Sequence, residues 1–159
     1  MQAVLAYGEA RKQFRREQES LPILLMGNDN KVGVCGEFWA KKYYVERGYE
    51  IVEVPRSNNE GYDFTCAKEG RVIRVSVKVV SRESKTGRQL RLKKSDEWDE
   101  LVMILLNEEL VPYCFGLVSR SQFSQAVCDR AIGEAPFMNR SACNPGGWIN
   151  RYGKVEKVG

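Results

Sequence analysis

Residues 63–79 read DFTCAKEGRVIRVSVKV, and this stretch decides which fold the chain adopts. Two runs with strand-like composition, 63–67 and 71–79, flank the turn sequence Lys-Glu-Gly at 68–70. Polar residues alternate in the second run with the apolar residues Ile73, Val75, Val77 and Val79. A period of two is typical of a strand with one buried face, so the stretch predicts a β-hairpin.

The hairpin also predicts which side chains share a face of the sheet. If the strands close around residues 68–71, Asp63 lies opposite Ser76 and diagonal to Lys78. The apolar face then carries Phe64, Cys66, Ile73 and Val75. The polar face carries Asp63, Thr65, Arg74, Ser76 and Lys78. A slip of one residue would exchange the two faces, so the separation of apolar from polar side chains favours this register.

Signals along the rest of the chain complete an α/β pattern. Helices are expected over 2–20, from about 34 to 47, from the N-cap Ser95 through Leu106, and from 119 to about 131. Strands are expected over 51–54 and 111–118. This order predicts a small mixed β-sheet flanked by helices. We expect a single domain over 1–159, with its core at about 33–120, an N-terminal helical extension at 1–30 and a C-terminal tail at 133–159.

The composition excludes several kinds of chemistry, because none of the 159 residues is histidine. Ser-His-Asp and Cys-His nucleophiles, His-ligated zinc and His-based proton relays are therefore impossible. Any catalysis must use carboxylates, Lys, Cys, Tyr or a metal bound by oxygen ligands. The five cysteines contain no CxxC pair and are expected to be buried, reduced thiols. The chain shows no membrane-spanning run and no signal-peptide arrangement, so we expect a cytoplasmic protein without a membrane partner.

Positive charge is concentrated in one segment of a chain whose net charge is only +4. Residues 71–94 contain nine Lys and Arg against one acid, so this segment carries +8 and the remainder carries −4. Such a strip is typical of a protein that binds the phosphate backbone of DNA. The expected DNA-binding residues are Arg74, Arg82, Lys85, Arg88, Arg91, Lys93 and Lys94. The alternative is a solvated hairpin whose charges serve only solubility.

Asp63 at a strand start and Lys78 on the neighbouring strand suggest a particular chemistry. Hydrolysis of a phosphodiester requires an activated water and neutralisation of negative charge in the transition state. Carboxylates that bind Mg²⁺, together with a lysine near the attacking water, supply both without histidine. Asp63 and Lys78 form the one pair in the sequence that is placed in this way.

The sequence here resembles the PD-(D/E)xK nuclease superfamily, and the restriction-endonuclease-like and Mrr-like members most. The similar segments are GEFWAKKYYVERGYEIV (36–52), GYDF (61–64), IRVSVK (73–78), LKKSDEW (92–98) and VPYCFGLV (111–118). They lie within residues 33–120, a little over half of the chain. The resemblance implies a restriction-endonuclease-like core. It also implies a magnesium site, with manganese as a possible substitute, formed by Glu37 and Asp63 with Lys78 beside it.

The sequence departs from the family pattern at two positions. Ser76 stands where the family has an acid two residues before the lysine, and Tyr62 stands where a proline precedes the aspartate. Some members with Ser-x-Lys take their second carboxylate from a downstream helix, and the resemblance then points to Glu97 or Asp96. Otherwise the site is inactive and the protein only binds.

The candidate residues also have purely structural interpretations. Glu37 is then a helix-start acid, Asp63 a turn residue and Lys78 one more member of the basic strip. We expect a metal-dependent DNA endonuclease that acts as a homodimer, with restriction, junction resolution and repair as open roles. The alternatives are a catalytically inactive module of the same fold that binds DNA or a partner protein, and a small protein-interaction domain.

Overall fold

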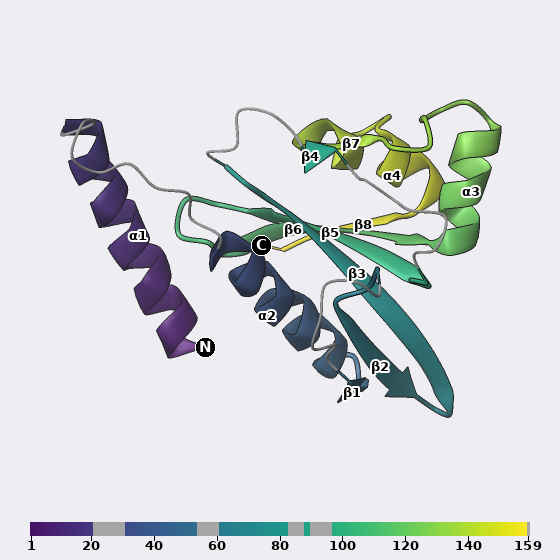
Figure 1. Ribbon diagram of the computed structural model, residues 1–159, viewed down its shortest axis with the longest axis horizontal. Coiled ribbons are helices and arrows are strands. Elements are labelled where there is room, and N and C mark those ends of the chain that lie inside the picture. Colours follow the sequence, from purple (N-terminus) through teal and green to yellow (C-terminus); the bar gives the residue numbers. More distant parts are fainter. Residues whose placement is uncertain (21–30, 54–60, 83–87, 90–96, 159) are drawn as a thin grey trace.

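The structure is a computed structural model that describes residues 1–20, 31–53, 61–82, 88–89 and 97–158 (Figure 1). Its main feature is a six-stranded mixed sheet with the strand order β1-β2-β3-β5-β6-β8. The elements are α1 (Gln2–Ser20), α2 (Lys31–Val45), β1 (Glu50–Glu53), β2 (Phe64–Lys68), β3 (Arg71–Ser81), β4 (Arg88–Gln89), β5 (Glu100–Leu106), β6 (Pro112–Ser119), α3 (Arg120–Cys128), β7 (Phe137–Met138), the 3-10 helix η1 (Arg140–Cys143), α4 (Trp148–Tyr152) and β8 (Lys154–Lys157). The expected mixed α/β fold is confirmed.

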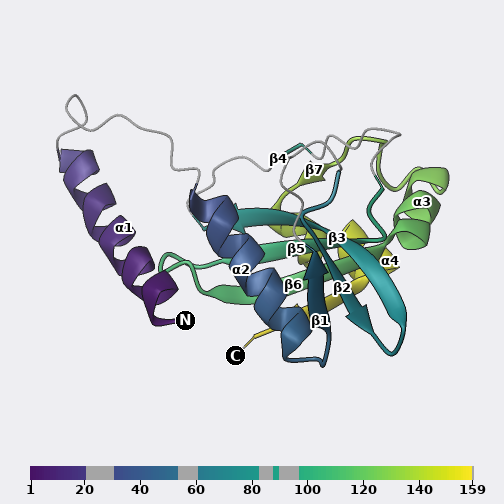
Figure 2. The ribbon, with the colours of Figure 1, turned by 60° about the horizontal axis from the view of Figure 1, so that its bottom comes forward.

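Helices cover the sheet on both faces (Figures 1 and 2). α2 lies across one face, where its Trp39 and Tyr44 pack against strand residues such as Phe64 and Val102. α3, α4 and η1 cover the opposite face around Trp98 and Met103. α1 stands to one side, with Lys12 paired to Glu109 in the turn between β5 and β6. The sheet therefore separates two hydrophobic cores.

The hairpin of β2 and β3 has the register expected from its alternation. Phe64 pairs with Val75 and Lys68 with Arg71, so Asp63, one residue before Phe64, falls opposite Ser76. The side chains of Phe64, Cys66, Ile73 and Val75 are all buried in the core below α2. The separation of faces expected from the sequence is therefore confirmed.

The helix expected from Ser95 through Leu106 is wrong, because residues 100–106 form strand β5. This strand runs parallel to β3 and antiparallel to β6, so both of its edges are paired within the sheet. Alternate residues enter the two cores, with Val102 in one and Met103 in the other. A strand buried on both faces has a continuous apolar sequence, which periodicity cannot distinguish from a buried helix. Ser95 and Asp96 lie outside the described residues.

The C-terminal tail adds a strand that the sequence did not predict. β8 pairs antiparallel with β6 and forms an edge of the sheet. Trp148 and Ile149 are buried and anchor the tail, whereas Phe137 is exposed. The helix expected at 119–131 begins as predicted, with a capping box between Ser119 and Gln122, but α3 already ends at Cys128.

The cysteines and the search for membrane-spanning helices concern two expectations drawn from the composition. All five cysteines are free thiols, but Cys128 is exposed and the other four are buried. No helix among the described residues is long and apolar enough to cross a membrane.

Candidate active site

Asp63 is fixed at the point where the chain enters the hairpin. Its backbone N–H donates to the carbonyl oxygen of Val75 over 2.8 Å. Its carboxylate accepts a hydrogen bond from the backbone N–H of Val77 at 2.5 Å and lies 3.5 Å from Ser76 Oγ. Three consecutive residues of β3 thus contact Asp63, and the carboxylate is oriented by backbone atoms as well as by side chains.

Lys78 is connected to Asp63 through the side chain of Ser76. Its Nζ donates to Ser76 Oγ over 3.3 Å, and the Ser76 side chain is almost completely buried. The two residues alternate on β3, so their side chains leave the strand on one face. A polar chain therefore runs from Lys78 through Ser76 to Asp63.

Glu37 comes to this group from α2, because the helix lies unusually close to β3. A Cβ atom on Gly36 would lie 2.0 Å from a methyl carbon of Val79, so only glycine permits this approach. The pKa of Glu37 is raised, first by burial and second by the negative charge of Asp63, while Lys41 and Lys78 oppose the shift. Lys41 Nζ lies 3.8 Å from the Glu37 carboxylate.

We call Glu37, Asp63, Ser76 and Lys78 the Asp63 cluster. It holds two carboxylates that repel each other and one ammonium group, and the Glu37 carboxyl is half-buried. Two carboxylates that repel each other suit a hard divalent cation, which would remove their repulsion. Lys41 was not foreseen from the sequence, although its i,i+4 spacing from Glu37 is a signal that can reveal such a pair.

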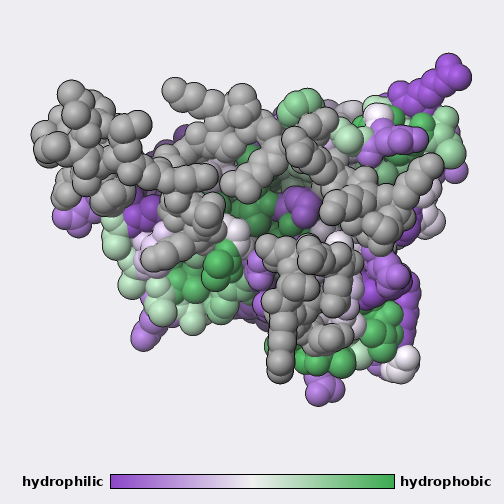
Figure 3. All heavy atoms as spheres, viewed as in Figure 1, coloured by the Kyte–Doolittle hydropathy of each residue, from purple (hydrophilic) through white to green (hydrophobic). Residues whose placement is uncertain are grey.

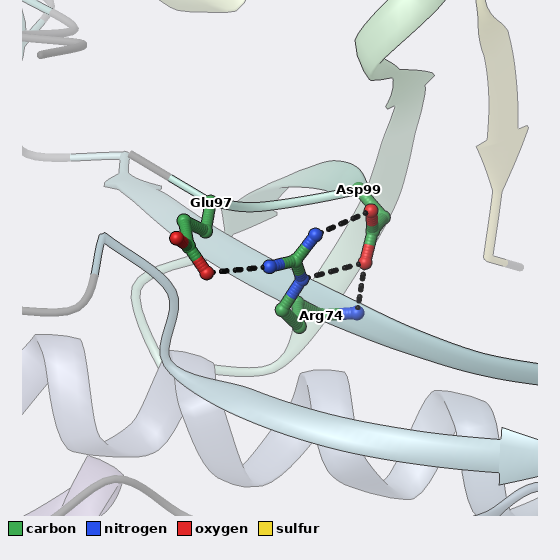
Figure 4. Close-up of polar contacts among 3 residues, drawn as sticks. All are labelled: Arg74, Glu97 and Asp99. Carbon is green, nitrogen blue, oxygen red and sulfur yellow. Dashed lines mark hydrogen bonds and ion pairs between the residues drawn. The ribbon is translucent and has the colours of Figure 1, made fainter. Parts of the chain in front are cut away.

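The structure places Glu97 in an ion-pair group with Arg74 and Asp99 (Figure 4). Glu97 Oε2 accepts from Arg74 Nη1 at 2.7 Å. Across the part of the chain that the structure describes, no three Cys, Asp or Glu side chains form a possible metal site. Glu97 is paired with Arg74 in this structure, and its role as a metal ligand beside Glu37 and Asp63 stays a prediction.

Asp99 holds Arg74 from the other side of its guanidinium group. The Asp99 carboxylate accepts from Arg74 Nε at 3.0 Å, from Nη2 at 3.1 Å and from the Arg74 backbone N–H at 2.8 Å. These contacts lower the pKa of Asp99, and the side-chain hydrogen bond from Arg74 is the largest cause. We call Arg74, Glu97 and Asp99 the Arg74 cluster. Asp99 was missed because the sequence placed it inside a helix.

The expected DNA-binding strip is described only in part. Hydrophilic residues follow the β3 side of the β2–β3 hairpin, at the right of Figure 3. Arg82 is two-thirds exposed and lies 3.5 Å from Glu108, and Arg88 belongs to β4, which pairs with β7. The other expected residues lie outside the described ranges, namely Lys85, Arg91, Lys93 and Lys94.

Comparisons with known proteins find similar folds among solved structures. No protein-family model and no curated protein sequence matches this chain. The fold is similar to that of a bacterial homing endonuclease, I-Ssp6803I, over 62% of this chain and 70% of that one, with 22% sequence identity and a TM-score of 0.49. At this identity and TM-score the similarity bears on neither the site nor its chemistry.

Proposed function

We propose that the protein is a metal-dependent endonuclease that hydrolyses phosphodiester bonds in DNA. The observation that carries this proposal is the Asp63 cluster, in which two carboxylates, one serine and one lysine from three separate segments meet. The order and types of these residues also resemble the PD-(D/E)xK pattern, apart from Ser76. Restriction-type cleavage is the form that the resemblance favours.

Glu37 and Asp63 are the residues that would hold Mg²⁺, with Mn²⁺ as a substitute. The negative charge of Asp63 helps to raise the pKa of Glu37, and this repulsion fits a site whose charge is completed by a cation. When bound, the ion supplies a polarised water and neutralises charge on the phosphate.

The side chains around this centre have separate roles in the proposal. The backbone N–H of Val77 orients Asp63 by binding one carboxylate oxygen, and the other oxygen faces the substrate in this proposal. Lys78 is held over Ser76, where its ammonium group orients the attacking water and stabilises negative charge on the phosphate. Ser76 supplies a hydroxyl that links the two.

A second candidate function is a DNA-binding module without catalysis. Ser76 carries no charge for a metal, and the downstream carboxylate Glu97 is bonded to Arg74 instead. Both observations favour a site that has lost one of its acids.

Incubation of plasmid DNA with the protein, with Mg²⁺ and then with EDTA, separates the two functions. We expect cleavage that EDTA abolishes and that Asp63→Ala and Lys78→Ala each remove. Cleavage that survives both substitutions would contradict the assignment. Absent cleavage with DNA binding that weakens steeply with salt would support the binding module.

Substitution of Ser76 by Glu sharpens this result. A gain of cleavage would indicate a site that has lost a carboxylate, because the new acid restores the family pattern. A loss of cleavage from an active wild type would indicate that the serine hydroxyl is needed where it is. Asp63→Ala in the same background shows whether any gained activity uses this site.

A nuclease of this size that cuts both strands of a duplex needs two active sites, so we also propose a homodimer. Light scattering coupled to gel filtration measures the mass directly. A monomer that linearises plasmid in one encounter would contradict this part of the proposal.

A further inference from the structure

The Arg74 cluster lies on the same strand as the Asp63 cluster and on the same face. Arg74, Ser76 and Lys78 occupy alternate positions of β3, so their side chains leave the strand in one direction. A strand rises about 3.3 Å per residue, which places Arg74 about 7 Å from Ser76 along β3. The guanidinium group of Arg74 is thus fixed on the same face of β3, two residues before Ser76 of the proposed reaction centre.

The two acids grip Arg74 very differently (Figure 4). Asp99 accepts three hydrogen bonds from it, two from the guanidinium and one from the backbone, and its own backbone N–H donates to the Arg74 carbonyl at 2.8 Å. Glu97 makes a single contact, to Nη1, and its side chain is 70% exposed. Asp99 therefore sets the orientation of the guanidinium, whereas Glu97 occupies its outward edge at little energetic cost to remove.

We propose that Glu97 is an exchangeable counter-anion, and that a backbone phosphate of DNA replaces it on Arg74. Asp99 is the positioning residue that presents the outward edge of the guanidinium. This inference rests on the proposed function, because it names the contact that aligns DNA beside the Asp63 cluster.

The chemistry of the exchange favours phosphate over the carboxylate. A guanidinium binds phosphate oxygens through a planar fork, and phosphate contacts gain free energy because counterions leave the DNA. One DNA strand carries a phosphate for about every 3.4 Å of helix axis, so a duplex with one phosphate at Asp63 has others within reach of Arg74. Glu97 then acts as a weak competitor that disfavours binding to ligands with less charge than DNA.

The test is a double-mutant cycle on DNA binding, measured by fluorescence anisotropy with a labelled duplex in EDTA so that no cleavage occurs. We expect Glu97→Gln to tighten binding about threefold, because Arg74 loses its competitor. In an Arg74→Gln background the same substitution should change the affinity by much less. Glu134→Gln, which removes an exposed carboxylate between α3 and β7, is the control for a general charge effect.

Several results overturn the inference while leaving the proposed function intact. The first is a gain in DNA affinity from Glu97→Gln that is the same with and without Arg74. The second is an equal gain in affinity from Glu134→Gln. The third is weaker DNA binding by Glu97→Gln, which would indicate a purely structural ion pair. If Arg74→Gln does not fold, Arg74→Lys replaces it, and the gain should fall by at least half because lysine lacks the fork. A wild type that binds no DNA would instead overturn the proposed function itself.

Discussion

The Asp63 cluster and the Arg74 cluster are two groups of charges on one face of β3, yet their electrostatics are opposite. In the Asp63 cluster, burial and a neighbouring negative charge raise the pKa of Glu37, so its ionised form is disfavoured. In the Arg74 cluster, hydrogen bonds from Arg74 lower the pKa of Asp99, so its ionised form is favoured. An acid whose ionised form the fold disfavours, beside a second charge, is typical of reaction centres.

The largest expected effect tests whether Lys78 has a role that its neighbour Lys41 lacks. Both lysines act on the charge of Glu37, but only Lys78 is bonded to Ser76. Lys78→Met should lower the rate of plasmid cleavage by about a hundredfold or more, as for loss of a group that assists proton transfer. Lys41→Met should lower it by less than about fivefold, since it removes only a partly exposed ion pair. Single-turnover rates at saturating Mg²⁺ measure both, and equal losses would contradict a special role for Lys78.

The next effect concerns the packing that brings Glu37 to the cluster. Gly36→Ala places a methyl group against Val79 and should lower the free energy of unfolding by about 1–3 kcal/mol. Gly33→Ala on the same helix meets no atom within 4 Å and should raise it by about 0.5–1 kcal/mol. Urea unfolding followed by circular dichroism compares the two. Equal effects of the two substitutions on the free energy of unfolding would show that the contact of α2 with β3 does not require glycine at position 36.

A smaller effect measures how firmly Asp99 holds Arg74. Arg74→Met should lower the free energy of unfolding by about 1 kcal/mol, because two guanidinium hydrogen bonds to the partly exposed Asp99 and one to Glu97 are lost. Lys42→Met removes the i,i+4 pair with Glu46 and should cost about 0.3–0.5 kcal/mol. Urea unfolding followed by circular dichroism measures both changes. A larger loss of stability from Lys42→Met than from Arg74→Met would contradict a firm contact between Asp99 and Arg74.

The smallest effect is a pH dependence with opposite signs in the two clusters. The pKa of Glu37 is raised above 4.5, so ionisation destabilises the fold, and Glu37→Gln should gain stability relative to wild type as pH rises above that value. The pKa of Asp99 lies below 3.8, so the advantage of wild type over Asp99→Asn should be present above 3.8 and vanish as pH falls further. Urea unfolding between pH 3 and 7 gives both trends. Parallel trends would show that the two acids share one environment.

The hairpin and part of the candidate site could be predicted because their signals are local. Strict alternation and a Gly-containing turn define the register of β2 and β3, and that register alone puts Asp63 beside Ser76. The position of Glu37 beside the Asp63 cluster could not be predicted from such local signals. It depends on the contact between Gly36 and Val79, which are far apart in the sequence.

The mistaken helix shows where local signals fail. Leu101–Leu106 is apolar throughout because two cores cover β5, and the acids that precede it imitate the first turn of a helix. The same error hid the contact of Asp99 with Arg74, since the Asp99 backbone N–H bonds to the Arg74 carbonyl oxygen on β3 instead of to a helical turn.

β5 also determines how the molecule loses its structure. Because its alternate residues belong to the two cores on opposite faces of the sheet, neither core can open without disturbing the strand they share. Unfolding is therefore expected to be cooperative across the whole sheet, with no partly folded form that keeps one core. The amide hydrogens between β3 and β5 should be the last to exchange with solvent. The strand that carries Arg74, Ser76 and Lys78 then belongs to the most slowly opening part of the protein.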